Sequence, residues 1–149
     1  MSVSTVGNGR VELSGRSALL AVGDLLAIGT FVAVGEFTHG INPFLNPGRF
    51  AGTLTPFLLG WVLVAAIGGL YTSDGIGTLR AAVSRTAVAW VLAVGIAQAL
   101  RATELFPGNA ALTFALVSIL VGGTLLVCWR SVAATLLHRY VDRKEGLLR

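Results

Sequence analysis

Four long apolar stretches in a chain of only 149 residues constrain its fold more than any other feature. They cover residues 17–37, 54–72, 86–103 and 110–130. Each is close to or above the roughly 20 residues that an α-helix needs to cross a hydrocarbon core of about 30 Å. A bilayer leaves no water to satisfy backbone groups, so such segments must be helical. The sequence therefore predicts an all-α fold, an integral membrane bundle of four transmembrane helices.

The composition agrees with this prediction. Hydrophobic residues make up 54% of the chain and charged residues 12%, whereas a soluble domain carries about 25% charged residues. The net charge of +4 does not indicate a nucleic-acid partner, because the basic residues lie near helix ends and form no stripe interleaved with aromatics. The expected partner is the lipid bilayer itself.

The chain divides into three expected parts. Residues 1–16 form a flexible cytoplasmic tail, residues 17–137 the four-helix transmembrane domain, and residues 138–149 a basic cytoplasmic tail. A signal peptide is the alternative for the first apolar run, because Arg10 and Arg16 precede it. That run is too long for a signal core, contains Asp24, and lacks a small-x-small cleavage site. It is predicted to be a retained first span.

Orientation follows from the distribution of lysine and arginine, which cytoplasmic loops accumulate. Nine of the eleven basic residues fall on the side of the two termini, and Arg49 and Arg101 fall on the other side. The nine are Arg10, Arg16, Arg80, Arg85, Arg130, Arg139, Arg143, Lys144 and Arg149. Both termini are therefore predicted to be cytoplasmic, in a multi-pass protein of the cell membrane.

Small residues at helical spacing mark contact faces, since lipid provides no hydrophobic drive between helices. One face is Ala89, Ala93 and Ala97; others pair Gly23 with Ala27, Gly29 with Ala33, and Ala65 with Gly69. Packing within one four-helix unit is favoured over a dimer face, and both remain open.

Asp24 is a charged residue inside the first predicted span. It lies about 9 Å inside the cytoplasmic surface at ~1.5 Å per residue. An ionised carboxylate there costs on the order of 2.5–3.5 kcal/mol, so it should face the bundle and be paired or protonated. Its candidate partners are Arg130, which lies near the inner surface and reaches inward with its long side chain, and Thr124, which lies at a depth similar to that of Asp24. A buried clamp between helices and an ion or proton site are both open interpretations.

A second polar cluster is expected near the opposite surface. Gln98, Arg101 and Glu104 are spaced by three along the third span, and Glu36 and His39 lie at similar height on the first. Arg101 lies about 20 Å from the cytoplasmic surface at a rise of ~1.5 Å per residue, deep enough to require a carboxylate. Glu36 or Glu104 is expected to supply it.

No pattern indicates an enzyme. The chain has no catalytic triad, phosphate-binding loop or zinc-protease motif, so no catalytic residue and no cofactor is predicted. Its single cysteine is Cys128, and its two histidines lie at opposite surfaces. No metal site is therefore predicted.

The order of several short motifs resembles that of a known family. The motifs are Gly23-Asp24-Leu25, Gly35 with His39-Gly40, Pro56-Phe57-Leu58 with Gly60-Trp61, Gln98-Ala99-Leu100-Arg101, and Trp129-Arg130. Together they resemble an uncharacterised integral membrane protein family, a domain of unknown function, from haloarchaea and actinobacteria. The resemblance runs from Gly23 to Arg130 and implies no enzyme activity, cofactor or substrate.

Two classes of function remain open. The chain is a small transporter or ion pathway that uses Asp24, or it is a non-catalytic scaffold or partner subunit that packs through glycine-rich helix faces. Either class is compatible with a homo-oligomer or a membrane-protein partner. A transporter should have a polar cavity that reaches Asp24, whereas a scaffold should have Asp24 sealed by a partner side chain.

Overall fold

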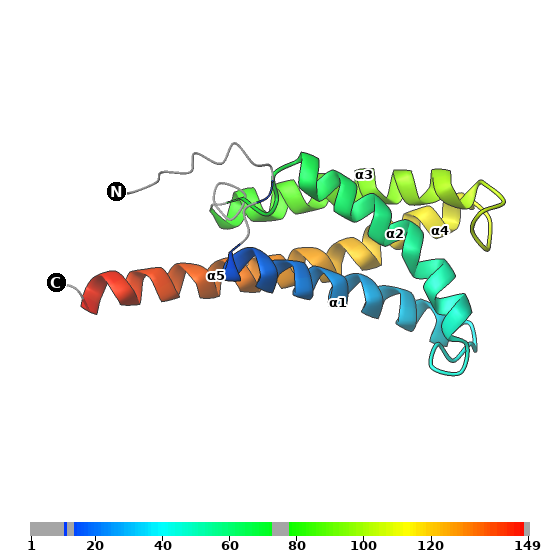
Figure 1. Cartoon of the computed structure of the whole chain (residues 1–149), viewed down its shortest axis with the longest axis horizontal. Helices are drawn as coiled ribbons and strands as arrows, with labels where there is room; N and C mark the ends of the chain where they lie inside the picture. Colours follow the sequence, from blue (N-terminus) through cyan, green and yellow to red (C-terminus); the bar gives the residue numbers. More distant parts are fainter. Residues whose placement is uncertain (1–10, 12–13, 73–77, 148–149) are drawn as a thin grey trace, which may run out of the picture.

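The computed structural model describes residues 11, 14–72 and 78–147. Its helices are α1 (Gly15–Thr38), α2 (Pro47–Ile67), α3 (Leu79–Arg101), α4 (Leu112–Val117), the π-helical turn η2 (Ser118–Gly122) and α5 (Gly123–Leu147). The last three form one continuous rod, so four helices are long and apolar enough to cross a membrane. Figure 1 shows them packed along a common direction. The predicted all-α membrane bundle is confirmed, and the described residues contain no strand.

The helix boundaries differ from the limits of the apolar stretches. The α2 helix begins at Pro47 rather than near residue 54, because proline suits the first helical position. It ends at Ile67 rather than near residue 72, because Gly69, two residues further on, adopts a left-handed φ of 64° that does not continue the helix. The α3 helix begins at Leu79 rather than near 86, with the Thr78 side chain capping it. Helices thus extend beyond their apolar residues.

The two predicted tails fare differently. Most of residues 1–16 lies outside the described part of the chain, but α1 already begins at Gly15, where Ser14 and Ser17 form a capping box. At the other end α5 runs without a break through Arg130 and on to Leu147. Figure 1 shows this end of α5 continuing past the start of α1.

Aromatic side chains fill the centre of the bundle. Phe57 stacks on Trp90 with ring centroids 5.8 Å apart, and Phe31 meets the edges of both rings. The indole N–H of Trp90 donates to the carbonyl oxygen of Ser118 at 2.8 Å, at the start of the π-helical turn. The indole is therefore buried with its polar group satisfied, as a tryptophan in an apolar core requires.

Glycines and alanines bring the helices close together, as predicted. A Cβ at Gly60 would collide with the backbone carbonyl of Ala93, so α2 and α3 touch through their backbones. Ala89, Ala93 and Ala97 are all buried. By contrast, a Cβ at Gly29 or Gly95 would meet no atom within 4 Å. Some of the small residues therefore do not lie at contacts between helices of the same chain.

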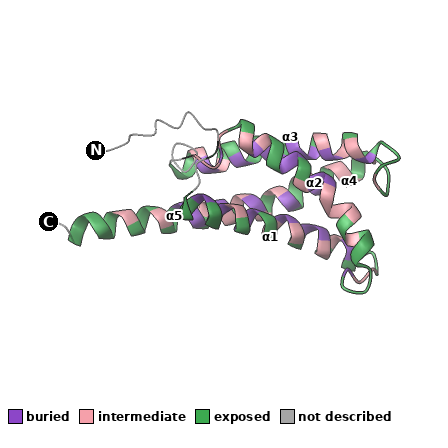
Figure 2. Ribbon diagram, in the orientation of Figure 1, coloured by how far each residue is buried: buried purple, intermediate pink, exposed green. Residues whose placement is uncertain are grey.

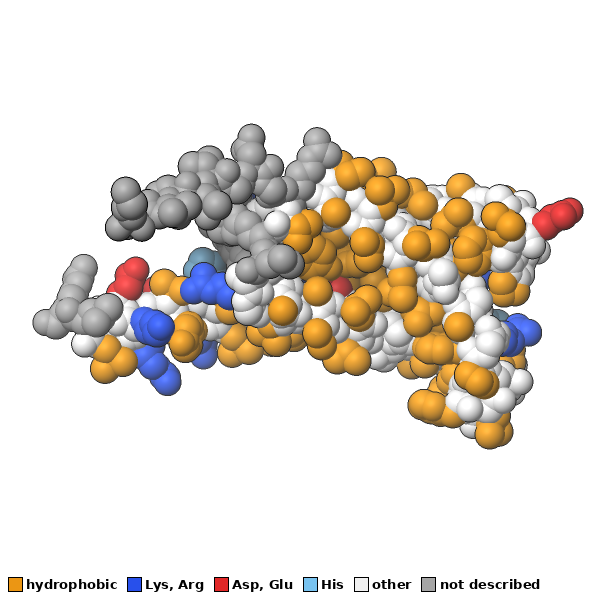
Figure 3. Space-filling model, viewed as in Figure 1, with side chains coloured by type: hydrophobic (Ala, Val, Ile, Leu, Met, Phe, Trp, Pro, Cys, Tyr) orange, Lys and Arg blue, Asp and Glu red, His pale blue; other side chains and the backbone are white. Residues whose placement is uncertain are grey.

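The outward faces of the helices are apolar. Figure 2 shows buried residues where helices meet and exposed residues around them, and Figure 3 shows hydrophobic side chains over the visible side of the bundle. Examples from the four spans are Leu26, Val62, Val88 and Leu120, each more than half exposed. Such a surface is expected of helices that contact lipid.

Candidate functional sites at the two ends of the bundle

Arg130 of α5 and Asp24 of α1 form a buried ion pair. The Nε of Arg130 donates to Oδ1 of Asp24 at 2.9 Å, and Nη2 donates to Oδ2 at 2.6 Å. The exposed fractions of the two side chains are 3% and 0%. Two parallel charge-assisted hydrogen bonds give the pair a fixed geometry. Of the two predicted partners of Asp24, the structure brings Arg130 to it.

Three further groups complete this site. The Tyr71 hydroxyl donates to Oδ2 of Asp24 at 2.6 Å, and the indole N–H of Trp61 donates to the Tyr71 oxygen at 3.0 Å. Nη1 of Arg130 donates to the carbonyl oxygen of Leu70 at 3.1 Å, just past the C-terminus of α2. A cation there also interacts favourably with the helix dipole. We call Asp24, Arg130, Tyr71 and Trp61 the clamp.

The sequence reasoning missed Tyr71 and Trp61. The available signal was the depth of Trp61, since a fully buried indole needs an acceptor for its N–H. Tyr71 lies past the end of α2, where burial, together with the negative charge of Asp24, raises the pKa of its hydroxyl. It therefore remains protonated at neutral pH and donates to the carboxylate.

The carboxylate at the centre of the clamp is buried, and its hydrogen bonds are made within the chain. Both oxygens of Asp24 accept hydrogen bonds from residues of the chain, and the arginine lies 5.0 Å from the centre of the Tyr71 ring. The pair ties α1 to α5, and Tyr71 and Leu70 bring in the segment after α2. These contacts join α1, α5 and the segment after α2.

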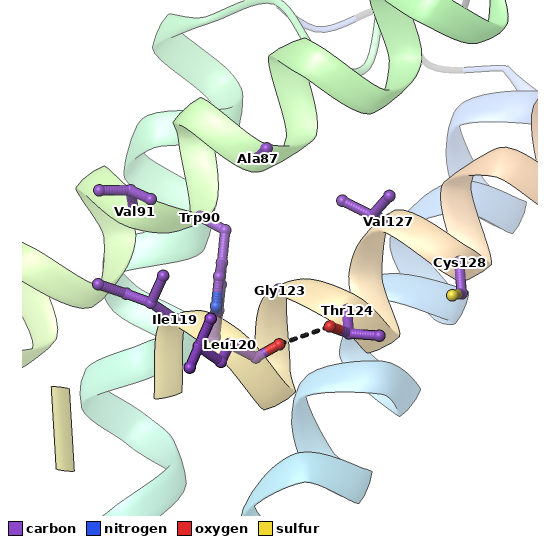
Figure 4. Close-up of a pocket in the computed structure, with 9 residues that line it drawn as sticks. All are labelled: Ala87, Trp90, Val91, Ile119, Leu120, Gly123, Thr124, Val127 and Cys128. Carbon is purple, nitrogen blue, oxygen red and sulfur yellow. Dashed lines mark hydrogen bonds between the residues drawn. The ribbon is translucent and has the colours of Figure 1, made fainter. Parts of the chain in front are cut away.

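Thr124, the other predicted partner of Asp24, lies elsewhere. Its hydroxyl donates to the Leu120 carbonyl oxygen of its own helix at 2.6 Å. Figure 4 shows it in an apolar cleft between α3 and the last helical rod, with Trp90 and Cys128 also on the wall. A threonine that bonds its own helix satisfies its hydroxyl without a distant partner.

The second site lies at the other end of the bundle, about 18 Å along α1 from Asp24 at ~1.5 Å per residue. Glu36 and Arg101 line one cavity of about 560 Å³ there, and they are only 6% and 8% exposed. We call it the Arg101 cavity. Its wall contains residues from α1, α2, α3, α4 and the connection between α1 and α2: Phe31, Val32, Gly35, Glu36, Thr38, His39, Ile41, Arg49, Thr53, Arg101, Thr113, Phe114 and Val117.

The charged groups of this cavity are only partly bonded. Oε1 of Glu36 accepts from the Thr53 hydroxyl at 3.2 Å, but Oε2 has no hydrogen-bond partner. Nε and Nη1 of Arg101 have none either, although its guanidinium carbon lies 4.5 Å from the centre of the Phe114 ring. Buried charges are normally paired. Buried donors and acceptors without a partner in the chain mark a place where water, an ion or a ligand can bind.

The predicted ion pair of Arg101 with Glu36 or Glu104 is wrong. In the described part of the chain, Arg130 and Asp24 form an ion pair, whereas no carboxylate forms one with Arg101. The reason is that α3 ends at Arg101, so the three-residue spacing no longer puts Glu104 on the same helical face. Glu104 is exposed instead, and Glu36 bonds Thr53.

The remaining predicted residues lie close to this end but differ in burial. His39 is exposed on the cavity wall, where its backbone N–H closes the end of α1. The amide oxygen and nitrogen of Gln98 are buried without a partner, one helical turn before Arg101. Thr53 and Phe114 also line the cavity, and the sequence did not indicate them. Thr53 lies on α2 because this helix begins before the apolar stretch, at Pro47. Phe114 reaches the cavity because α4 packs back against α3, which only the tertiary structure shows.

Metal chemistry has no evident site in the described residues. No group of three or more histidine, cysteine, aspartate or glutamate side chains that could hold a metal ion occurs in that part of the chain.

Comparison with known proteins identifies the family of the chain. The family model DUF3054, described as a protein of unknown function, matches residues 21–133. No curated protein and no solved structure matches the chain. The matched range contains both the clamp and the charged residues of the Arg101 cavity, and it confirms the predicted membership in a family of unknown function. The chain belongs to the DUF3054 family.

Proposed function

We propose that this multi-pass membrane protein binds a small anion-bearing molecule in the Arg101 cavity. The observation that carries the proposal is the pair of buried, incompletely bonded charged groups on one cavity wall. An arginine with two unbonded nitrogens and a glutamate with one unbonded oxygen define a site for a ligand that has acceptors and a donor. The volume of about 560 Å³ lies within the roughly 300–1,000 Å³ of small-molecule sites.

The site differs from the one expected of a transporter that uses Asp24. A coupling residue must exchange partners with solvent or substrate, whereas Asp24 is fully buried and both its oxygens are bonded. Asp24 is also absent from the wall of the Arg101 cavity. These facts favour a structural role for Asp24 and a binding role for Arg101. No enzymatic step is part of the proposal.

The distribution of basic residues supports an orientation. With nine of eleven on the side of the termini, both termini are proposed to be cytoplasmic in the cell membrane. The Arg101 cavity then lies at the external surface. In this arrangement its ligand arrives from outside the cell or from the outer leaflet.

A scaffold or partner subunit is the second candidate, and it is compatible with the first. Gly29 on α1 and Gly95 on α3 have open space where a Cβ would be. Small residues on lipid-facing helices allow another helix to approach closely. A second copy of the chain or another membrane protein could therefore pack there, and cross-linking from cysteines at these positions in a Cys128→Ser background tests it.

A thermal-shift experiment tests the binding proposal. Purified protein in detergent is heated with sulfate, inorganic phosphate, glutamate or phosphoethanolamine at constant ionic strength. A ligand specific for the folded state raises the melting temperature with concentration. We expect at least one of these compounds to do so for the unmodified protein and not for Arg101→Gln. Arg80→Gln is the matched control, because Arg80 is exposed at the other end of α3. Equal shifts in all three proteins would contradict the proposal.

A further inference from the structure

We infer that the ligand of the Arg101 cavity is a phospholipid headgroup in which a phosphate is joined by a short linker to an N–H or O–H donor. The inference rests on the proposed function and specifies its ligand. It follows from three properties of the cavity wall: the unbonded nitrogens of Arg101, the unbonded oxygen of Glu36, and the apolar side chains of Phe31, Val32 and Val117.

Arg101 requires several acceptor oxygens. Nε and Nη1 carry N–H bonds that point in different directions, and neither nitrogen has a partner. One carbonyl oxygen leaves the charge of the guanidinium unpaired, whereas a phosphate presents several acceptor oxygens and a full negative charge to one of its N–H edges. Arginine is the side chain that matches phosphate geometry best. The Phe114 ring on the guanidinium holds the group in place.

Glu36 requires a donor and disfavours a bare anion. Its Oε1 already accepts from Thr53, and Oε2 is free on the same cavity that Arg101 lines. Free phosphate near this carboxylate would suffer like-charge repulsion. An ammonium or hydroxyl beyond the phosphate removes that conflict, because it donates to Oε2. The exposed Arg49 and His39 line the same cavity and add polar groups at its wall.

Part of the wall is apolar and suited to a lipid. Phe31, Val32 and Val117 line the cavity from within the spans, on α1 and α4. Other large apolar side chains of the same two helices are exposed: Val34 and Phe37 on α1, Leu112 and Leu116 on α4. A water-soluble ligand leaves these surfaces unused. The acyl chains of a lipid would cover them while the headgroup reaches Glu36 and Arg101.

Binding of short-chain lipids to the full chain, measured by native mass spectrometry from detergent, tests the inference. The probes are dioctanoyl phosphatidylethanolamine and phosphatidylglycerol, which carry a donor, and dioctanoyl phosphatidylcholine, whose choline has none. Soluble phosphoethanolamine supplies the headgroup without chains. The variants are Arg101→Gln, Glu36→Gln and Gly35→Leu; the last fills the cavity from a position where a Cβ meets nothing. Gly95→Leu is its control, since Gly95 is equally open but lies off the cavity.

We expect the unmodified protein to bind the two donor-bearing lipids at least tenfold more tightly than phosphatidylcholine or phosphoethanolamine. Arg101→Gln and Gly35→Leu should lower that affinity at least tenfold, Gly95→Leu should not, and Glu36→Gln should erase the preference over phosphatidylcholine. Equal affinities for the three lipids, or an unchanged affinity in Arg101→Gln, would overturn the inference. If phosphoethanolamine binds as tightly as the lipid in an Arg101-dependent way, the lipid is wrong but the proposed function stands.

Discussion

Arg130 holds both carboxylate oxygens of Asp24 although the two residues are 106 positions apart in the chain. The pair closes the bundle by joining the first membrane-spanning helix to the last. At the other end Arg101 has the same side chain in a similarly buried position but no carboxylate. One arginine is fully bonded within the chain and the other is not, and this contrast leads to opposite expectations for the two.

Removing the positive charge should have opposite effects at the two ends. Arg130→Met leaves Asp24 buried without its cation, which costs about 3–5 kcal/mol. Arg101→Met removes a buried charge that has no anionic partner, and the flexible methionine thioether can pack on the Phe114 ring in place of the guanidinium. We expect the ligand-free Arg101→Met protein to melt at an equal or higher temperature than the parent, and Arg130→Met well below it. A fall of similar size in both variants would show that Arg101 is bonded after all.

The two charges of the clamp should be strongly coupled. Asp24→Asn leaves the Arg130 guanidinium buried without an anion, and Arg130→Gln leaves the carboxylate without a cation. The double variant removes both charges and keeps polar side chains of similar length. We expect it to be more stable than the sum of the two single losses predicts, with a coupling of about 1–3 kcal/mol. Unfolding in detergent measures it, and additive losses would contradict the ion pair.

The Tyr71 hydroxyl should contribute measurably to stability. Tyr71→Phe removes the donor to Asp24 and deprives the buried Trp61 indole of its acceptor, at a cost of about 1–3 kcal/mol. Tyr140→Phe is the control, because Tyr140 is exposed on α5 and its hydroxyl loss should be nearly neutral. If the two phenylalanine variants unfold alike, the tyrosine bridge does not exist in the folded protein.

Replacing Gly60 or Gly29 with alanine should change the stability of the protein in opposite directions. Gly60→Ala forces a Cβ into the Ala93 backbone carbonyl, so α2 and α3 must move apart; we expect destabilisation of about 1–3 kcal/mol. Gly29→Ala meets open space and gains helix propensity, which stabilises by about 0.5–1 kcal/mol. Thermal unfolding of both variants checks the close contact of α2 with α3.

Topology can be tested with cysteines in a Cys128→Ser background, because Cys128 is itself exposed. Leu147→Cys should react with a membrane-impermeant thiol reagent only after the membrane is opened. Asn46→Cys, in the connection between α1 and α2, should react in intact cells. The reverse pattern would invert the orientation and turn the Arg101 cavity toward the cytoplasm.

The amino-acid sequence by itself determined the architecture. Span length and apolarity leave no alternative to helices in a bilayer, so four runs of apolar residues sufficed to predict four membrane helices. The cost of burying Asp24 likewise indicated a partner, and Arg130, whose long side chain reaches inward from the surface, was one of two candidates. These inferences depend only on the hydrogen bonds within one helix and on the depth of a charged group along the membrane normal.

Only the tertiary structure decided how the polar groups are bonded. The sequence does not give the rotation of each helix about its own axis. It therefore could not show that Thr124 bonds its own helix, or that Tyr71 reaches Asp24 from beyond the end of α2. Arg101 lost its expected partner because α3 ends at that residue and Glu104 turns away. The position of a helix end and the rotation of its neighbours depend on packing of the whole bundle, and this is why the cavity emerged only in three dimensions.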